Sequence, residues 1–78
     1  MSSKEIFKNM LELCFDEDFL DLHQELVQLE IETKKNKDYK SAMGELIDII
    51  PLFTEGDFPQ EIMLQIEELY ENFLENSE

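Results

Sequence analysis

Apolar and polar residues follow one another along the chain with the spacing of amphipathic helices. In four separate stretches the apolar side chains recur every three or four residues, the period at which one face of an α-helix repeats. This spacing predicts helices at about 3–14, 16–34, 38–50 and 59–75. Each helix has one broad apolar face, so we expect a single all-α domain over residues 1–78, folded as a compact antiparallel four-helix bundle.

Residues at the ends of these stretches support the boundaries. Ser2 or Ser3 can cap the first helix, and Asp16 is suited to cap the second, because short polar side chains accept hydrogen bonds from the free amides of a helix start. Pro51 lacks a backbone N–H group and is expected to kink or end the third helix, with one further turn through Phe53 as the alternative.

The second predicted helix has a central apolar stripe with further apolar residues beside it. Leu20, Val27 and Ile31 are expected to widen that face beyond its central stripe. Gly44 lies inside the third helix at a cost of about 1 kcal/mol relative to alanine, and close helix packing is the expected reason. The central stripe of the second helix comprises Phe15, Phe19, Leu22, Leu26 and Leu29.

The net charge is the composition feature that most narrows the function. Twenty acidic residues against six lysines give −14 at pH 7 on 78 residues, whereas a few units of charge keep a small domain dissolved. All six lysines lie in residues 1–40, and residues 41–78 hold ten acids and no base. A negative field of this size repels nucleic acids and anionic membranes and attracts basic surfaces. We therefore expect a basic protein partner, with neither nucleic acid nor membrane bound directly.

Side chains for catalysis or metal binding are few. The single cysteine, Cys14, lies among apolar residues beside an acidic run, so it is expected to fill the core, and the single histidine, His23, belongs to a different predicted helix. Asp16 and Asp18 have the opening spacing of a calcium loop, but the positions of its glycine and final glutamate hold aspartate and valine. The sequence therefore predicts no enzyme activity, no metal site and no cofactor.

The cellular location follows from the same features. One cysteine permits no intrachain disulfide, and residues 1–5 lack the apolar segment of a signal peptide. No apolar run approaches the length needed to cross a bilayer. A cytoplasmic protein is expected.

Carboxylates form rows along two of the predicted helices. Their spacing of three and four residues places each row on one helix face, and no lysine follows Lys40 to offset the rows on the last helix. A second row on the last helix comprises Glu67, Glu71 and Glu78. The predicted partner-binding residues are Asp18, Asp21, Glu25 and Glu32 with the second helix, and Glu61, Leu64, Glu68, Glu71 and Glu75 on the last.

Charge governs association rate and partner choice, while affinity normally needs buried apolar anchors. Leu64 and Tyr39 are candidate anchors outside the core stripes. Phe53 and Phe58 are further candidates, although they are expected to close one end of the bundle instead.

The length, the four predicted helices, the acidic face from Asp18 to Glu32 and the lack of disulfides resemble the small acidic all-α immunity proteins that neutralise nuclease bacteriocins and contact-dependent toxins. The resemblance implies a bacterial or phage inhibitor that blocks a basic toxin nuclease or another nucleic-acid enzyme at its active site or an exosite. The nuclease-colicin members carry an adjacent tyrosine pair, whereas Tyr39 and Tyr70 are separate here, so no residue role is transferred.

Other functions fit the same pattern. The main alternative is a small adaptor or regulatory subunit that docks a partner helix in a hydrophobic groove, with the acidic rows at its rim. A self-associating bundle and an enzyme of unknown chemistry are further alternatives.

Overall fold

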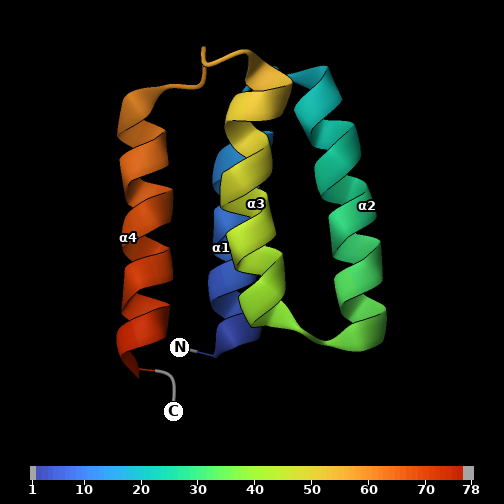
Figure 1. Ribbon diagram of the computed structural model, residues 1–78, viewed down its shortest axis with the longest axis vertical. Coiled ribbons are helices and arrows are strands. Elements are labelled where there is room, and N and C mark those ends of the chain that lie inside the picture. Colours follow the sequence, from blue (N-terminus) through green and yellow to red (C-terminus); the bar gives the residue numbers. More distant parts are fainter. Residues whose placement is uncertain (1, 77–78) are drawn as a thin grey trace.

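The computed structural model describes residues 2–76, and within them the chain is helical with no strand. The helices run alternately up and down, so that neighbours in the sequence are antiparallel (Figure 1). The predicted four-helix bundle is therefore confirmed. None of these helices is long and apolar enough to cross a membrane. Their bounds are α1 Ser3–Phe15, α2 Leu20–Asn36, α3 Tyr39–Thr54 and α4 Gln60–Asn76.

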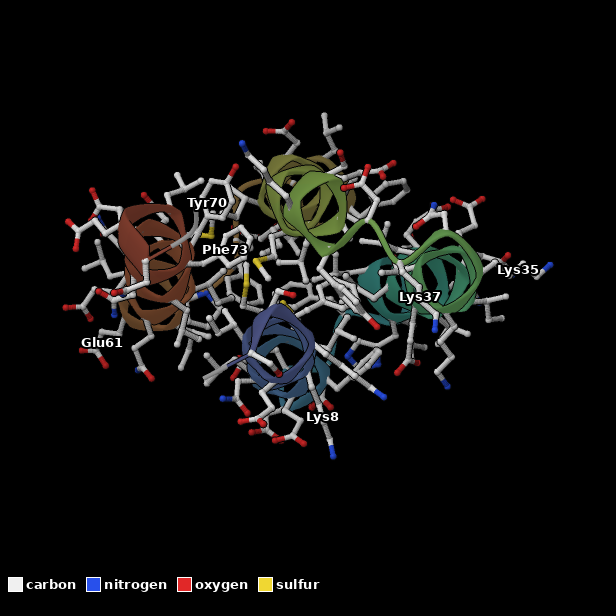
Figure 2. The ribbon with its side chains drawn as sticks, turned by 90° about the horizontal axis from the view of Figure 1, so that it is seen from below. Lys8, Lys35, Lys37, Glu61, Tyr70 and Phe73 are labelled. Atoms are coloured by element: carbon white, nitrogen blue, oxygen red, sulfur yellow. The ribbon has the colours of Figure 1, made fainter. Side chains whose placement is uncertain are left out.

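The helices are arranged as a flattened diamond, measuring 34 × 26 × 17 Å overall. Seen along the bundle, α1 and α3 face each other across the middle, and α2 and α4 occupy opposite edges (Figure 2). Over the described residues α1 and α3 each pack against all three other helices, whereas α2 and α4 do not contact each other. Each edge helix therefore presents a broad outer face to solvent.

The core is built unequally by the four helices. α1 and α3 supply most of it, and α4 contributes a single fully buried side chain, Ile66. Thr33 and Thr54 are buried polar residues, and each hydroxyl donates to a carbonyl one turn earlier at 2.7 Å. The buried apolar residues are Ile6, Phe7, Met10, Leu11, Cys14, Leu22, Leu26, Leu29, Ala42, Met43, Leu46, Ile50 and Ile66.

The start of α2 differs from the prediction. Ser2 caps α1 as expected, its hydroxyl accepting from the Glu5 amide at 3.2 Å, but Asp16 is the C-cap of α1 and α2 begins only at Leu20. The Asp16 amide donates to the Glu12 carbonyl at 3.1 Å and so completes the last turn of α1. The link between α1 and α2 reverses the direction of the chain. Its acidic residues therefore lie in this turn and not in the first turn of α2.

The third helix does not end at residue 50. It continues through Pro51 to Thr54, so the alternative of one further turn through Phe53 is correct to within one residue. A proline removes one helical hydrogen bond, and Pro51 is exposed on the surface of the helix. The Thr54 hydroxyl adds a bond to the Ile50 carbonyl, and the helix ends where Glu55 and Gly56 adopt left-handed φ values of 53° and 79°.

Leu20, Val27 and Ile31 do not widen the buried face of α2. They are 74%, 43% and 45% exposed, because an edge helix that packs only against α1 and α3 buries a narrow stripe. That buried stripe comprises Leu22, Leu26, Leu29 and Thr33.

Three of the four candidate anchors pack against the core. Phe53 and Phe58 are half-buried, and the Phe58 ring lies 5.9 Å from that of Phe19 in the first link, which confirms that they close one end of the bundle. Tyr39 is half-buried with its ring 5.9 Å from that of Phe7. Only Leu64, 57% exposed, remains available as an anchor.

Candidate functional site

All the residues predicted to bind a partner are exposed. Asp18 lies in the link before α2, and the other acids of the first group lie on α2 itself. The second group, which includes Leu64, lies along α4. Glu78, the last member of the additional row, lies outside the described residues.

The two groups do not form one surface. α2 and α4 occupy opposite edges of the bundle and do not touch over residues 2–76 (Figure 2). Glu61 points outward at the α4 edge, away from α2. A partner that covers one group therefore leaves the other free, and each surface has to be considered separately.

A groove between α3 and α4 gathers part of the second group. Its volume is about 740 Å³, and three predicted residues, Leu64, Glu68 and Glu71, contribute to its walls. No basic residue lines it, and the nearest lysine along α3 is Lys40, one turn before Gly44. The complete lining comprises Gly44, Ile47 and Asp48 from α3 with Leu64, Glu67, Glu68, Tyr70 and Glu71 from α4.

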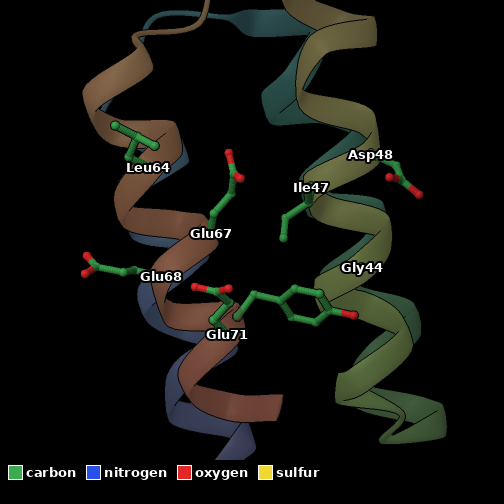
Figure 3. Close-up of a pocket in the computed structure, with 8 residues that line it drawn as sticks. Gly44, Ile47, Asp48, Leu64, Glu67, Glu68 and Glu71 are labelled. Atoms are coloured by element: carbon green, nitrogen blue, oxygen red, sulfur yellow. The ribbon is translucent and has the colours of Figure 1, made fainter. Parts of the chain in front are cut away.

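The lining separates into a centre and a rim. Figure 3 shows Glu67 of α4 and Ile47 of α3 pointing into the space between the two helices. Glu68 and Asp48 point away from that space on either side. An occupant of the groove therefore meets apolar contact and a carboxylate at the centre, with further carboxylates at both edges.

A glycine lies in the α3 wall of the groove. A Cβ atom at Gly44 would lie 3.5 Å from the Tyr70 hydroxyl, so the tyrosine of α4 reaches α3 beside this glycine. Because 3.5 Å is an ordinary contact distance, close helix packing as the reason for Gly44 stays a prediction. Gly44 and Ile47 both line the groove from α3.

Sequence reasoning missed Asp48, Ile47 and Tyr70 as members of a site. Asp48 lies four residues after Gly44, which places both on one face of α3, but that face carries no row of acids to single it out. Glu67 was noted in the additional row, and it lies between Leu64 and Glu71 at helical spacing. The glycine inside a helix was the one available signal.

Gly44→Ala is expected to raise the free energy of unfolding by about 0.5–1 kcal/mol, because alanine is the better helix former and its Cβ meets Tyr70 at an ordinary contact distance. Urea denaturation measures the change. Gly56→Ala is the matched control and should destabilise the fold, since Gly56 has φ +79° even though the space around it is open. A loss of stability in Gly44→Ala would show that the tyrosine cannot accommodate a methyl group.

The surroundings of Cys14 and His23 indicate that both side chains contribute to the fold. Cys14 is fully buried, and burial raises the pKa of its thiol to about 12, which leaves no thiolate near neutral pH. The His23 Nε2–H group donates to the Glu17 carbonyl, and the ring packs edge-on against Phe15 at 5.3 Å. His23 thus fastens the first link to α2. The described part of the chain contains no group of three or more residues placed to hold a metal ion.

The six lysines lie toward one end of the bundle, where acids such as Glu5, Glu32 and Asp38 also lie. The lysines lie where α1 begins, α2 ends and α3 begins, and Figure 2 looks at this end, with Lys8, Lys35 and Lys37 in view. The opposite end contains both acidic links and no lysine. The lysines are Lys4, Lys8, Lys34, Lys35, Lys37 and Lys40.

The geometry thus provides a lysine-free groove with Ile47 and Glu67 at its centre and further carboxylates at its rim. Comparisons of the chain with protein-family models, with curated proteins and with solved structures gave no match.

Proposed function

We propose that this protein is a non-catalytic inhibitor that binds a basic protein through the α3–α4 groove. The observation that carries the proposal is the groove itself, in which an apolar centre and four carboxylates occur together without any basic residue. The partner proposed is a basic toxin nuclease or another nucleic-acid enzyme, as for an immunity protein or a DNA mimic of bacterial or phage origin.

The net charge of −14 supports a role for attraction at long range. A field of this size speeds the approach of a basic partner and disfavours acidic ones. Once contact is made, Leu64 and Ile47 offer the apolar surface from which affinity usually derives. Glu67, Glu68 and Glu71 then pair with cations of the partner around that contact.

A nucleic-acid enzyme is the partner class favoured by the geometry of the acids. Such enzymes line their substrate grooves with basic residues because the substrate carries phosphates. Carboxylates fixed along α4 at helical spacing can lie in such a groove in place of a phosphate backbone. Binding there excludes the substrate without any chemistry by the inhibitor.

We place this activity in the cytoplasm. The single cysteine is free and buried, so the fold depends on no disulfide and suits a reducing compartment.

The test starts by capturing the partner from the host lysate on the immobilised protein and identifying it by mass spectrometry. The identified partner is then purified, and its own activity and its affinity are measured. We expect the inhibitor to abolish that activity and affinity to fall as salt rises. Neutralising the groove with Asp48→Asn, Glu67→Gln, Glu68→Gln and Glu71→Gln together should weaken binding by about tenfold or more, since each exposed pair contributes roughly 0.2–1 kcal/mol.

A control variant removes the same charge elsewhere, with Asp21→Asn, Glu25→Gln, Glu32→Gln and Asp57→Asn. It should bind as wild type, apart from a small loss of long-range attraction. If this control loses the partner and the groove variant keeps it, the α2 edge is the interface and the groove assignment is wrong. A captured protein whose activity is unchanged by binding excludes inhibition.

The adaptor alternative is favoured by one observation, the 57% exposure of Leu64 at the groove. In that case apolar contact dominates. Leu64→Ser alone should then weaken binding more than neutralising all four carboxylates of the groove. The opposite ranking supports the charged docking surface.

A further inference from the structure

A second hollow lies between α1 and the last two turns of α2, and we call it the α1–α2 hollow. Its volume is about 320 Å³, at the lower end of the range usual for small-molecule sites. It shares no residue with the α3–α4 groove, so a ligand here leaves that groove free. The lining comprises Lys4, Phe7, Lys8 and Leu11 from α1, Glu30, Thr33 and Lys34 from α2, and Tyr39 from α3.

The floor of the α1–α2 hollow is mainly apolar. Phe7 and Leu11 belong to the buried core, and the ring of half-buried Tyr39 lies 5.9 Å from that of Phe7. The Thr33 hydroxyl donates to the Leu29 carbonyl at 2.7 Å, so its proton is already engaged within the fold. The floor therefore offers a ligand apolar contact, and the lysines are the donors around it.

Lysines outnumber carboxylates around this hollow, which is the reverse of the chain as a whole. Three of the six lysines line it beside one glutamate, Glu30, although the whole chain has twenty acids. Lys4 and Lys8 are one turn apart on α1, and Lys34 lines the wall formed by α2. Figure 2 shows Lys8 pointing outward from α1. The charge of the lining favours an anion.

The acids around the hollow limit the size of that anion. Glu5, Glu12 and Asp38 are close in the chain to lining residues but do not line the hollow themselves. At about 0.15 M salt the screening length is about 8 Å, so a small ligand responds mainly to the charges of the lining. A large acidic partner would cover the neighbouring carboxylates as well and would meet the field of −14. A small anion fits this balance, and an acidic macromolecule does not.

We propose that the α1–α2 hollow binds a small amphipathic carboxylate, with its charged end among Lys4, Lys8 and Lys34 and its apolar tail against the floor. Lysine stems lie along apolar surface while their ammonium groups stay in water, so one ligand can contact both. A carboxylate accepts charge-assisted hydrogen bonds from ammonium groups. A neutral apolar molecule lacks these bonds, and an inorganic anion lacks the contact with the floor. The site uses no residue of the α3–α4 groove, so it is tested independently of inhibition.

Titration of the full chain with octanoate in about 0.15 M salt, followed by the NMR shifts of backbone amides, tests the site. We expect saturable shifts centred on the lining residues and a dissociation constant below about 1 mM. Octanamide supplies the tail without the charge, and inorganic phosphate supplies charge without a tail. Each should bind about tenfold more weakly or worse. Equal binding of either probe overturns the proposal, as do octanoate shifts centred on another part of the chain.

Lysine variants separate this site from general attraction to cations. Lys4→Gln, Lys8→Gln and Lys34→Gln together should raise the dissociation constant for octanoate about tenfold or more, because exposed ion pairs are individually weak but three are lost. Circular dichroism confirms that the variants are folded. An equal loss in the matched control would overturn the assignment to this hollow. That control removes the same charge from the three lysines outside the lining, with Lys35→Gln, Lys37→Gln and Lys40→Gln.

Glu30→Gln tests the site in the opposite direction. It removes the one carboxylate of the lining, so the dissociation constant for octanoate should fall about twofold or more. Such a gain in affinity cannot arise from damage to the fold. Weaker binding of octanoate by Glu30→Gln contradicts the proposed place of the ligand's carboxylate.

Discussion

Leu46→Ala is expected to lower the free energy of unfolding by about 3 kcal/mol. Leu46 is fully buried on α3, and α3 packs against all three other helices, so the cavity left by the truncation opens where the helices converge. A chain of 78 residues has a total stability of roughly 4–12 kcal/mol, of which this loss is a large share. Urea denaturation followed by circular dichroism measures it.

Leu52→Ala provides the control on the same helix. Leu52 is 73% exposed, so the same truncation should change the stability by less than about 0.5 kcal/mol. Equal losses in the two variants would show that α3 does not form the centre of the core.

Raising the pH from 9 to 11 is expected to cost the fold about 2–3 kcal/mol through Cys14 alone. Burial raises the pKa of this thiol from 9.0 to about 12 in the folded chain. Above pH 9 the unfolded chain therefore releases the proton while the folded chain retains it, and unfolding is favoured. The contribution is fully present below pH 9 and is lost as the pH rises toward 12. Urea denaturation at pH 8, 9, 10 and 11 follows the loss.

Other groups also titrate in this range, so the thiol is isolated by comparison with Cys14→Ala. The variant starts from a lower stability because it leaves a small cavity. Its further loss between pH 9 and 11 should be smaller than that of the wild type by about 2–3 kcal/mol. Parallel pH profiles would place the thiol of the wild type in contact with solvent.

The sequence was sufficient for the number of helices and for the ends set by local chemistry. Ser2 and Asp38 each accept a hydrogen bond from the amide three residues later, at 3.2 Å in both cases, as short polar residues at helix starts usually do. The prediction that Asp16 caps the start of the second helix was wrong because aspartate can also lie at the end of a helix. The third helix continues past Pro51 because a proline costs one backbone hydrogen bond, and packing of the following turn can offset that cost.

The sequence alone does not show which apolar stripe of α2 is buried. The helix carries leucines on its core side and Leu20, Val27 and Ile31 on its outer side. Periodicity shows that both stripes exist, but only the position of α2 at the edge of the diamond decides which one is covered. Leu26 is fully buried and Val27, its neighbour, is 43% exposed.

The candidate site was predictable only in part, for a related reason. Charged residues without partners remain in solvent, so the exposure of the acids on α2 and α4 follows from their chemistry. The groove depends on how closely α4 approaches α3. One place where the two helices meet is Tyr70 beside Gly44, residues 26 positions apart in the chain. Nothing local in the sequence encodes such a pair.

The way in which α4 packs on the core has a consequence for the groove. Ile66 is the one fully buried side chain of α4, and the helix otherwise rests on the core through half-buried apolar residues such as Leu69 and Phe73. Local opening of such an element requires less free energy than unfolding of the whole domain, so its amide hydrogens exchange with solvent early. A molecule seated between α3 and α4 holds this helix closed, and ligand capture and completion of the fold become a single equilibrium.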